Sequence, residues 1–295
     1  MSRYIGLIGC PVKHSISPYF QQAALDYYGL DIRYEAWETP PAKLPDVVTN
    51  LRKPQNLGAN VTVPYKETVL PLLDEVDDLA NSIGAVNTIV KKEDKLVGAN
   101  TDAYGFVEAL DKERHFDPRG KKVVVLGAGG VARAVSFILL QRKIAALAIT
   151  DGIFERAGAL AEDLVGHIGQ ASSRAKNSEP SISAFEWENL DSARTLAGCD
   201  LIVHCTTIGM KYSPQEGRSP LRFEVIPKDV LVYDVVYNPS LTPLLRLAQE
   251  AGANTLGGLP MLVYQGAASF KLWTGKEAPV DIMLNEAKEM LTRKQ

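Results

Sequence analysis

The chain has 295 residues, a length that suits two domains of about 100 to 200 residues each. Its 32 basic and 35 acidic residues give a formal net charge of -3, which excludes the strong positive field that nucleic-acid binding or an anionic membrane surface requires. The hydrophobic content of 46% suits a globular core, and no apolar run reaches the length of a membrane span. We therefore expect a cytoplasmic protein with small-molecule partners and no nucleic-acid or membrane partner. The sequence leaves open whether it is a monomer or homodimer.

The first hundred residues alternate between strand and helix patterns. An apolar run over residues 4–9 predicts a strand, and Ser17 followed by Pro18 predicts the N-cap and first turn of a helix that ends at Gly29. Further strands are expected at residues 33–37, 59–63, 86–90 and 96–99, of which the last two flank a polar turn, as in a hairpin. The alternation predicts an α/β fold built from parallel sheets.

Two short stretches in this half end a strand-like run in uncharged hydrogen-bonding residues followed by one charge. They read N-V-T-V-P-Y-K at 60–66 and N-T-D at 100–102, so they end in opposite charges at Lys66 and Asp102. This pattern suits a polyhydroxylated ligand and an acid/base pair.

After a helix expected over 102–113, an apolar strand around Val123 runs into a glycine turn and a second helical pattern. A strand, a glycine turn and a helix N-terminus together form a cradle for a pyrophosphate. The cofactor contacts expected in this cradle are Gly127, Ala128, Gly129, Gly130, Val131 and Ala132.

Strand patterns at 145–150, 201–205 and 230–234 complete a doubly wound, Rossmann-like sheet. The segments 171–183 and 211–222 have loop composition, and helical periodicity returns over 266–291. We expect the cofactor domain to begin near Tyr104.

The cysteines and histidines give no sign of a metal site. Cys10, Cys199 and Cys205 are odd in number, far apart and without C-x-x-C spacing, which indicates reduced thiols. His14 has no second ligand at metal-binding spacing, so we interpret it as an exposed loop residue.

Seven motifs in order resemble those of the shikimate dehydrogenases, from about residue 4 to residue 290. They are S-I-S-P at 15–18, N-V-T-V-P-Y-K at 60–66, G-A-V-N-T at 84–88, N-T-D at 100–102, the glycine turn at 127, D-V-V-Y-N-P at 234–239 with T-P-L at 242–244, and G-G-L-P-M-L-V-Y-Q at 257–265.

This resemblance implies a substrate-binding domain at 1–103, a nicotinamide dinucleotide-binding domain at 104–258, and C-terminal helices at 259–295 that cross back to the first domain. It also implies reversible reduction of 3-dehydroshikimate to shikimate at C3, a step of aromatic amino acid biosynthesis. The catalytic pair of the family corresponds to Lys66 and Asp102. A lysine can donate the proton that the reduced oxygen needs, and we expect Asp102 to orient it.

The same resemblance implies the substrate contacts. Ser15 and Ser17 match serines that bind the substrate carboxylate, although Ser17 is equally explained as a helix N-cap. The remaining matches are neutral hydrogen-bonding residues suited to a polyol: Asn60, Thr62, Asn87, Thr101, Tyr237 and Gln265.

Two departures from the family concern the cofactor. Where NADP-dependent members commonly carry Asn-Arg-Thr, this chain has Asp151, whose carboxylate repels a 2′-phosphate but can bind a ribose hydroxyl. We therefore predict a preference for NAD, with NADP as the alternative through Arg156. The second departure is H-C-T-T-I-G-M at 204–210, where Asn-Ala-Thr is usual. Further cofactor contacts are expected at Thr206, Val235, Gly258 and Met261.

Three alternatives remain open. The chain could be a quinate/shikimate dehydrogenase that works mainly on quinate with NAD, since quinate differs by a hydroxyl at C1. It could also be a metabolite sensor without turnover, although Lys66 and Asp102 are both present. A folate-linked methylene dehydrogenase shares the two-domain plan but does not explain the serines and the N-T-D motif.

Overall fold

The computed structural model describes residues 3–171 and 180–294. The chain forms two compact units, which we call unit 1 (Met1–Glu108 with Pro260–Gln295) and unit 2 (Ala109–Leu259). The last segment of the chain therefore returns to the unit in which the chain starts. Most of the loop expected at 171–183 lies outside the described residues.

Unit 1 contains a six-stranded sheet in the order β2-β1-β3-β5-β6-β4. The strands are β1 (Arg3–Gly9), β2 (Ile32–Glu38), β3 (Asn56–Val61), β4 (Glu75–Val76), β5 (Thr88–Lys92) and β6 (Lys95–Ala99). Strand β1 is parallel to β2 and β3, but β5 is antiparallel to both of its neighbours. The sheet is thus mixed rather than parallel, because the short β5–β6 turn reverses the chain as the predicted hairpin requires.

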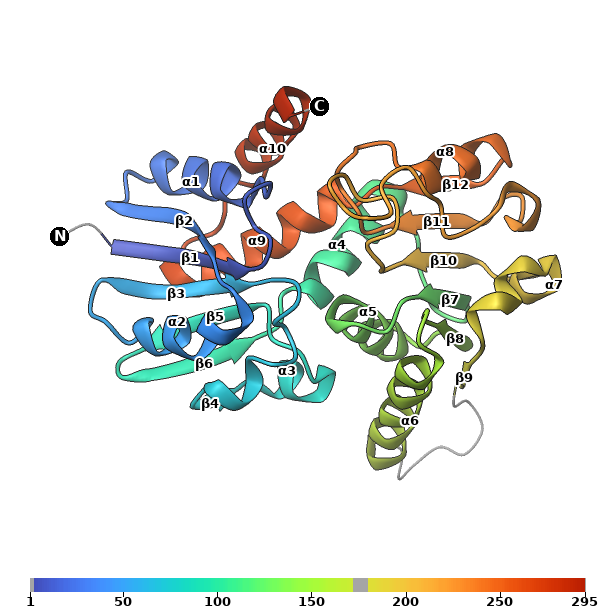
Figure 1. The fold of residues 1–295 in the computed structure, drawn as a ribbon, viewed down its shortest axis with the longest axis horizontal. Helices are drawn as coiled ribbons and strands as arrows, with labels where there is room; N and C mark the ends of the chain where they lie inside the picture. The colour runs from blue at the N-terminus through green and yellow to red at the C-terminus, as the bar shows by residue number, and fades with distance from the viewer. Residues whose placement is uncertain (1–2, 172–179, 295) are drawn as a thin grey trace. The chain divides into compact units, whose positions relative to one another are not determined.

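The helices of unit 1 come from both ends of the chain (Figure 1). They are α1 (Ser17–Tyr27), α2 (Leu44–Asn50), α3 (Asp78–Ile83), α4 (Asp102–Arg114), which continues into unit 2, α9 (Leu259–Thr274) and α10 (Val280–Lys294), with 3-10 turns at Pro41–Lys43 and Leu70–Leu72. The helical pattern expected over 266–291 is two helices, because Gly275, with φ of 69°, ends the first.

Unit 2 has a second six-stranded sheet, in the order β12-β11-β10-β7-β8-β9, with every pairing parallel. Its strands are β7 (Lys122–Leu126), β8 (Ala146–Thr150), β9 (Ser181–Ala184), β10 (Leu201–His204), β11 (Leu231–Asp234) and β12 (Asn254–Leu256). This is the doubly wound order, whose switch point lies between β7 and β10. The predicted Rossmann-like sheet is confirmed.

The helices of unit 2 connect these strands as parallel pairing requires. They are α5 (Gly130–Gln141), α6 (Phe154–Ala171), α7 (Ala193–Leu196) and α8 (Pro243–Glu250), with 3-10 turns at Trp187–Asp191 and Phe223–Val225. Because helices cover the central parallel strands, β7, β8, β10 and β11 are mostly apolar, and Val124, Ile202 and Val232 lie in one buried cluster. Of the helices described in either unit, none is long and apolar enough to cross a membrane.

Two glycines let three helices of unit 1 pack closely. A Cβ atom on Gly105 of α4 would lie 2.7 Å from Cβ of Gln265 on α9, and one on Gly266 would lie 2.7 Å from the ring of Phe20 on α1. The Gln21 amide also donates to the carbonyl of Gly266 over 2.9 Å. These contacts fix α9 against the helices that begin at Ser17 and Asp102.

We predict that Gly105→Ala destabilises the protein by about 1 to 3 kcal/mol, because the added methyl group has no space between α4 and the backbone of α9. Urea unfolding measures the change. The matched control is Gly158→Ala on α6, where a Cβ meets nothing within 4 Å and helix propensity predicts a gain of about 0.5 to 1 kcal/mol. Equal effects at the two positions would contradict the close packing.

Candidate functional site

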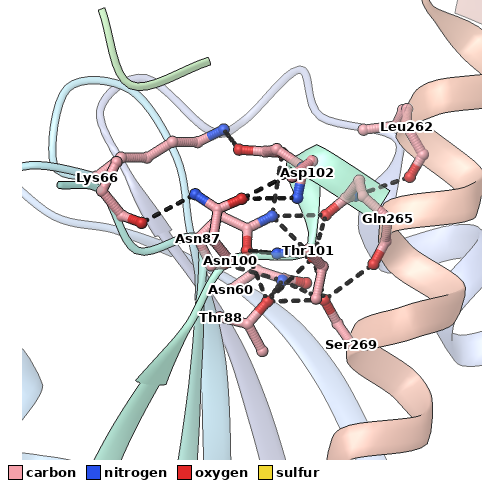
Figure 2. A network of polar contacts seen from close by, with 12 residues as sticks. Asn60, Lys66, Asn87, Thr88, Asn100, Thr101, Asp102, Leu262, Gln265 and Ser269 are labelled. Carbon is pink, nitrogen blue, oxygen red and sulfur yellow. Dashed lines mark hydrogen bonds and ion pairs between the residues drawn. The ribbon is translucent and has the colours of Figure 1, made fainter. Parts of the chain in front are cut away.

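The strand order of unit 1 gathers polar residues at one edge of the sheet. Asn60 near the end of β3 pairs with Thr88 at the start of β5, and Thr88 pairs with Ala99 at the end of β6. Residue 87 directly precedes β5 and residues 100–102 directly follow β6, so the G-A-V-N-T and N-T-D motifs meet the N-V-T-V-P-Y-K motif at the same edge. Figure 2 shows the resulting network of polar contacts.

Asn100 sets the start of helix α4. Its side-chain oxygen accepts hydrogen bonds from the backbone N–H groups of Asp102 (3.0 Å) and Ala103 (3.3 Å), and its amide donates to the carbonyl of Ala85 over 2.8 Å. Asp102 is thereby held in the first turn of the helix, where the helix dipole favours a carboxylate. Sequence reasoning assigned Asn100 no role, although an asparagine just before a helix is a recognisable capping signal.

Lys66 and Asp102 form an ion pair at this edge. Lys66 Nζ lies 2.6 Å from Asp102 Oδ2, and the two side chains are only 11% and 6% exposed. The Lys66 carbonyl accepts the N–H of Val86 over 2.7 Å, which fixes the loop that carries the lysine. The sequence predicted an acid/base pair from two distant segments, and the structure brings them into direct contact (Figure 2).

A buried amide supports the carboxylate of this pair. The amide nitrogen of Asn87 lies 3.0 Å from Asp102 Oδ1 and 3.1 Å from Gln265 Oε1, and its side-chain oxygen accepts the N–H of Thr101 over 2.8 Å. Asn87 is 2% exposed. Because a buried polar group without partners is costly, these contacts fix the orientation of both Asn87 and Asp102.

Beneath this amide lies a cluster of buried hydroxyl groups. Ser269 Oγ is within hydrogen-bond distance of Thr88 Oγ1 (2.8 Å), Thr101 Oγ1 (3.0 Å) and the Asn60 amide (3.1 Å). The Asn60 oxygen in turn accepts from Tyr34 over 2.7 Å, and burial raises the pKa of that tyrosine. The side chain of Asn60 is thus engaged within the protein.

Sequence reasoning did not select Thr88, Ser269 or Tyr34. Ser269 stands one helical turn after Gln265 on α9, so helical spacing from the expected glutamine could have found it. Tyr34 lies in the middle of a strand and gave no such signal.

The other substrate residues expected in unit 1 lie on neighbouring segments. Thr62 follows β3, and Ser15 and Ser17 stand at the start of α1. The helix is capped differently from the prediction, because its N-cap is Ile16 and the Ser15 hydroxyl accepts the N–H of Ser17 over 3.2 Å. The side chain of Ser17, which is 6% exposed, makes no capping bond. Tyr237 belongs to unit 2.

The glycine turn of unit 2 has the geometry of an anion cradle. Gly127 adopts φ of 113°, and a Cβ there would lie 3.1 Å from the backbone of Cys205, so both its conformation and its surroundings require glycine. Gly129 is the N-cap of α5, and Gly130, Val131 and Ala132 form its first turn. The free N–H groups at such a helix start suit a pyrophosphate, so the residues present fit a dinucleotide.

Asp151 closes this turn instead of standing apart from it. Its carboxylate accepts the N–H of Ala128 over 2.8 Å and that of Ile153 over 3.0 Å. Arg156, on the first turn of α6, places its guanidinium 3.6 Å from the position that a Cβ of Gly129 would occupy. The Arg156 guanidinium therefore lies beside the glycine turn, and the Asp151 carboxylate accepts hydrogen bonds from backbone N–H groups.

The remaining cofactor residues lie in both units. Thr206 follows β10, and a Cβ on Gly258 would lie 2.1 Å from the carbonyl oxygen of Val235, so the segments of Gly258 and Val235 are in close contact. Met261, on α9, belongs to unit 1 and is buried. His14 is exposed, and within residues 3–171 and 180–294 no group of three or more His, Cys, Asp or Glu side chains could hold a metal ion.

Two features define the class of this protein. One unit has a doubly wound parallel sheet with a glycine-rich turn, and the other is an α/β unit with a lysine–aspartate pair in a neutral polar cluster. This combination is that of a two-domain α/β protein of the dinucleotide-binding class. Family models agree with this class: residues 7–89 match the shikimate dehydrogenase substrate binding domain, and residues 258–288 match the shikimate 5'-dehydrogenase C-terminal domain.

Comparison with individual proteins extends the match to nearly the whole chain. A shikimate dehydrogenase (NADP(+)) of Methanopyrus kandleri is 43% identical over 97% of this chain and 95% of its own length. The crystal structure of the Thermus thermophilus enzyme with NADP(H) and shikimate is 35% identical, with a TM-score of 0.83 over 98% of this chain and 99% of that one. Quinate dehydrogenase from Corynebacterium glutamicum, in complex with NAD, is 30% identical, with a TM-score of 0.85 over 98% and 99%. The chain belongs to the shikimate dehydrogenase family.

The expected preference for NAD is wrong. Curated relatives that are 36 to 43% identical to this chain are each named shikimate dehydrogenase (NADP(+)). The argument from Asp151 failed because it treated the carboxylate as a group available to the ribose. In the structure that carboxylate binds two backbone N–H groups of its own loop and the glycine turn.

We predict that Asn87→Asp destabilises the protein by about 3 kcal/mol or more near pH 7, because it places a second carboxylate 3.0 Å from Asp102 in a buried cluster. The neighbouring charge raises the pKa of the new carboxyl group, so the penalty is largest above that pKa and shrinks as the pH falls through it. Urea unfolding at about pH 7 and about pH 5 measures the difference.

The control for this change is Asn81→Asp at an exposed position of α3, which we expect to alter stability by less than about 0.5 kcal/mol. A penalty at position 87 that is independent of pH would show that the two carboxylates do not interact.

Proposed function

We propose that the protein catalyses the reversible reduction of 3-dehydroshikimate to shikimate with NADPH, a step of aromatic amino acid biosynthesis. The observation that carries this proposal is the 2.6 Å contact between Lys66 and Asp102 inside a cluster of neutral hydrogen-bonding side chains. Such a cluster suits a ring with several hydroxyl groups, and the pair supplies a proton. In this proposal unit 1 binds the substrate and unit 2 binds the dinucleotide.

Lys66 is the proton donor in this proposal. Hydride addition at C3 of the ketone leaves negative charge on the oxygen, and Lys66 Nζ donates a proton to it; in the oxidative direction the same nitrogen accepts the proton of the C3 hydroxyl. Asp102 holds Nζ in place with one carboxylate oxygen and is itself held through the other by Asn87. The bound dinucleotide supplies the hydride.

The expected binding residues take matching roles. Ser15 and Ser17 bind the substrate carboxylate in the proposal, while Thr62, Asn87, Thr101 and Gln265 contact the ring hydroxyls. Asn60 supports them from below, since its amide contacts Asn87, Thr88, Ser269 and Tyr34.

For the cofactor we propose NADP, held at the glycine turn by the N-terminus of α5 and at its 2′-phosphate by Arg156. The support is the position of the guanidinium beside Gly129, together with the NADP(+) of the named relatives. Arginine binds a phosphate through two parallel hydrogen bonds, which a neutral side chain cannot reproduce.

We also propose a cytoplasmic, reducing setting. Within the described residues, Cys10, Cys199 and Cys205 form no disulfide bond. Burial raises the pKa of Cys199 to about 12, so this thiol stays protonated and resists oxidation.

The proposal is tested by NADPH and NADH formation with shikimate and quinate as substrates, each with NADP⁺ and NAD⁺ at equal concentrations. Turnover of shikimate with NADP⁺ supports it. Faster turnover of quinate would support the second candidate, which the similarity to a quinate dehydrogenase favours. Binding without turnover in all four mixtures would support a metabolite sensor and overturn the proposal.

We predict that Lys66→Ala lowers kcat for shikimate oxidation by about 10²- to 10⁴-fold, because the proposed acceptor of the C3 proton is removed. The control is Lys43→Ala, at a lysine whose side chain is 67% exposed, which we expect to leave kcat near the wild-type value. Steady-state rates measure both variants. A Lys66→Ala enzyme with wild-type turnover and pH dependence would contradict the assigned role.

We predict that Arg156→Gln raises KM for NADP⁺ about 10- to 100-fold while KM for NAD⁺ changes little, because a charge-assisted contact to the 2′-phosphate is lost. Arg142→Gln, at the C-cap of α5, is the matched control away from the glycine turn. Initial rates with each cofactor give the two constants. If KM for NADP⁺ and KM for NAD⁺ rose by the same factor, the proposed contact of Arg156 with the 2′-phosphate would be wrong.

A further inference from the structure

The carboxyl ends of β10 and β11 hold a buried chain of polar side chains in unit 2. His204 Nε2 lies 2.5 Å from Thr206 Oγ1, and His204 Nδ1 lies 2.9 Å from Asp234 Oδ1. Asp234 also accepts the hydroxyl proton of Thr242 over 2.6 Å. His204, Asp234 and Thr242 are 0% exposed. The histidine occupies one of the positions at which the sequence departs from its family.

The hydrogen-bond partners of His204 and Asp234 decide where the protons lie. Asp234 Oδ1 accepts the N–H of Val236 over 3.0 Å, so the carboxylate is an acceptor on every side and His204 Nδ1 donates to it. In the neutral ring Nε2 then carries the lone pair, and Thr206 donates its hydroxyl proton to Nε2. The Thr206 oxygen also accepts the N–H of Ile208 over 3.2 Å, so these two hydrogen bonds fix the orientation of the hydroxyl group.

Thr206 stands directly against the glycine turn. Its Cγ2 lies 3.1 Å from the position that a Cβ of Gly127 would occupy, and the N–H of Cys205 donates to the carbonyl of Leu126 over 2.7 Å. A change in the Thr206 rotamer therefore moves atoms that contact the turn proposed to hold the pyrophosphate. The buried histidine controls that rotamer together with the hydrogen bond from Ile208.

We propose that His204 is a positioning residue of the dinucleotide site, which acts through Thr206 to hold the loop after β10 against the glycine turn. This inference rests on the proposed use of NADP. It assigns the histidine a role in cofactor affinity, with Asp234 fixing its tautomer and Thr206 transmitting its position.

The test is a double-mutant cycle of His204→Asn and Thr206→Val, read as the Kd for NADP⁺ by titration calorimetry. An asparagine amide can keep the contact to Asp234 but is too short to reach Thr206, and valine has the shape of threonine without the hydroxyl. Each single change should raise Kd about fivefold, the effect of one lost hydrogen bond, and the double variant should be no weaker than either. His115→Asn, at an exposed histidine, is the matched control and should bind as wild type does.

Further readouts separate this proposal from a merely structural role and from the proposed function. The ¹⁵N shifts of the His204 ring should show protonated Nδ1 and unprotonated Nε2, and kcat of His204→Asn at saturating NADP⁺ should stay near that of wild type. Three results would each overturn the proposal. They are a double variant whose fold-increase in Kd is the product of the two single increases, a protonated Nε2 in the wild-type protein, and an unchanged Kd in His204→Asn. NADP⁺ binding without turnover of shikimate would refute only the proposed reaction, while a wild-type protein that binds no NADP⁺ would overturn both.

Discussion

The proposed chemistry of unit 1 depends on the Lys66–Asp102 ion pair. An exposed pair of this kind contributes little, whereas a buried one is favourable only when its remaining hydrogen-bonding capacity is satisfied. The protein satisfies it from two sides, because Asn100 fixes the helix start that carries Asp102 and Asn87 binds the free carboxylate oxygen. Three separate segments of sheet edge must therefore assemble before the pair can form.

Both units place polar side chains at the edge of the sheet where parallel strands end, and in unit 1 the start of the antiparallel strand β5 lies at the same edge. In unit 1 these residues lie at and just after the end of β3, and in unit 2 they lie at and just after the ends of β7, β10 and β11. Strands buried on both faces leave no room for polar side chains along their length, so polar residues collect where the chain leaves the sheet. In unit 2 the same constraint explains the buried histidine beside Thr206, since His204 is the last residue of β10.

Sequence patterns predicted the Rossmann-like sheet, the hairpin of β5 and β6, and the two segments that carry Lys66 and Asp102. They could not show which donor binds which acceptor, because that depends on packing between segments distant in the chain. Asp151 illustrates this limit: its position after a strand suggested contact with a ribose, but its carboxylate closes the glycine turn. Ser269 illustrates it too, since its close polar contacts with Asn60, Thr88 and Thr101 require α9 to lie against the sheet of unit 1.

The central claim is that Lys66 exchanges a proton with the C3 oxygen of shikimate. A crystal structure of the protein with bound shikimate tests it most directly. The account predicts that the C3 hydroxyl lies within hydrogen-bond distance of Lys66 Nζ, with ring hydroxyls on Asn87 and Gln265. A ring bound in the opposite orientation, with its carboxylate on Lys66 and C3 away from Nζ, would contradict the account.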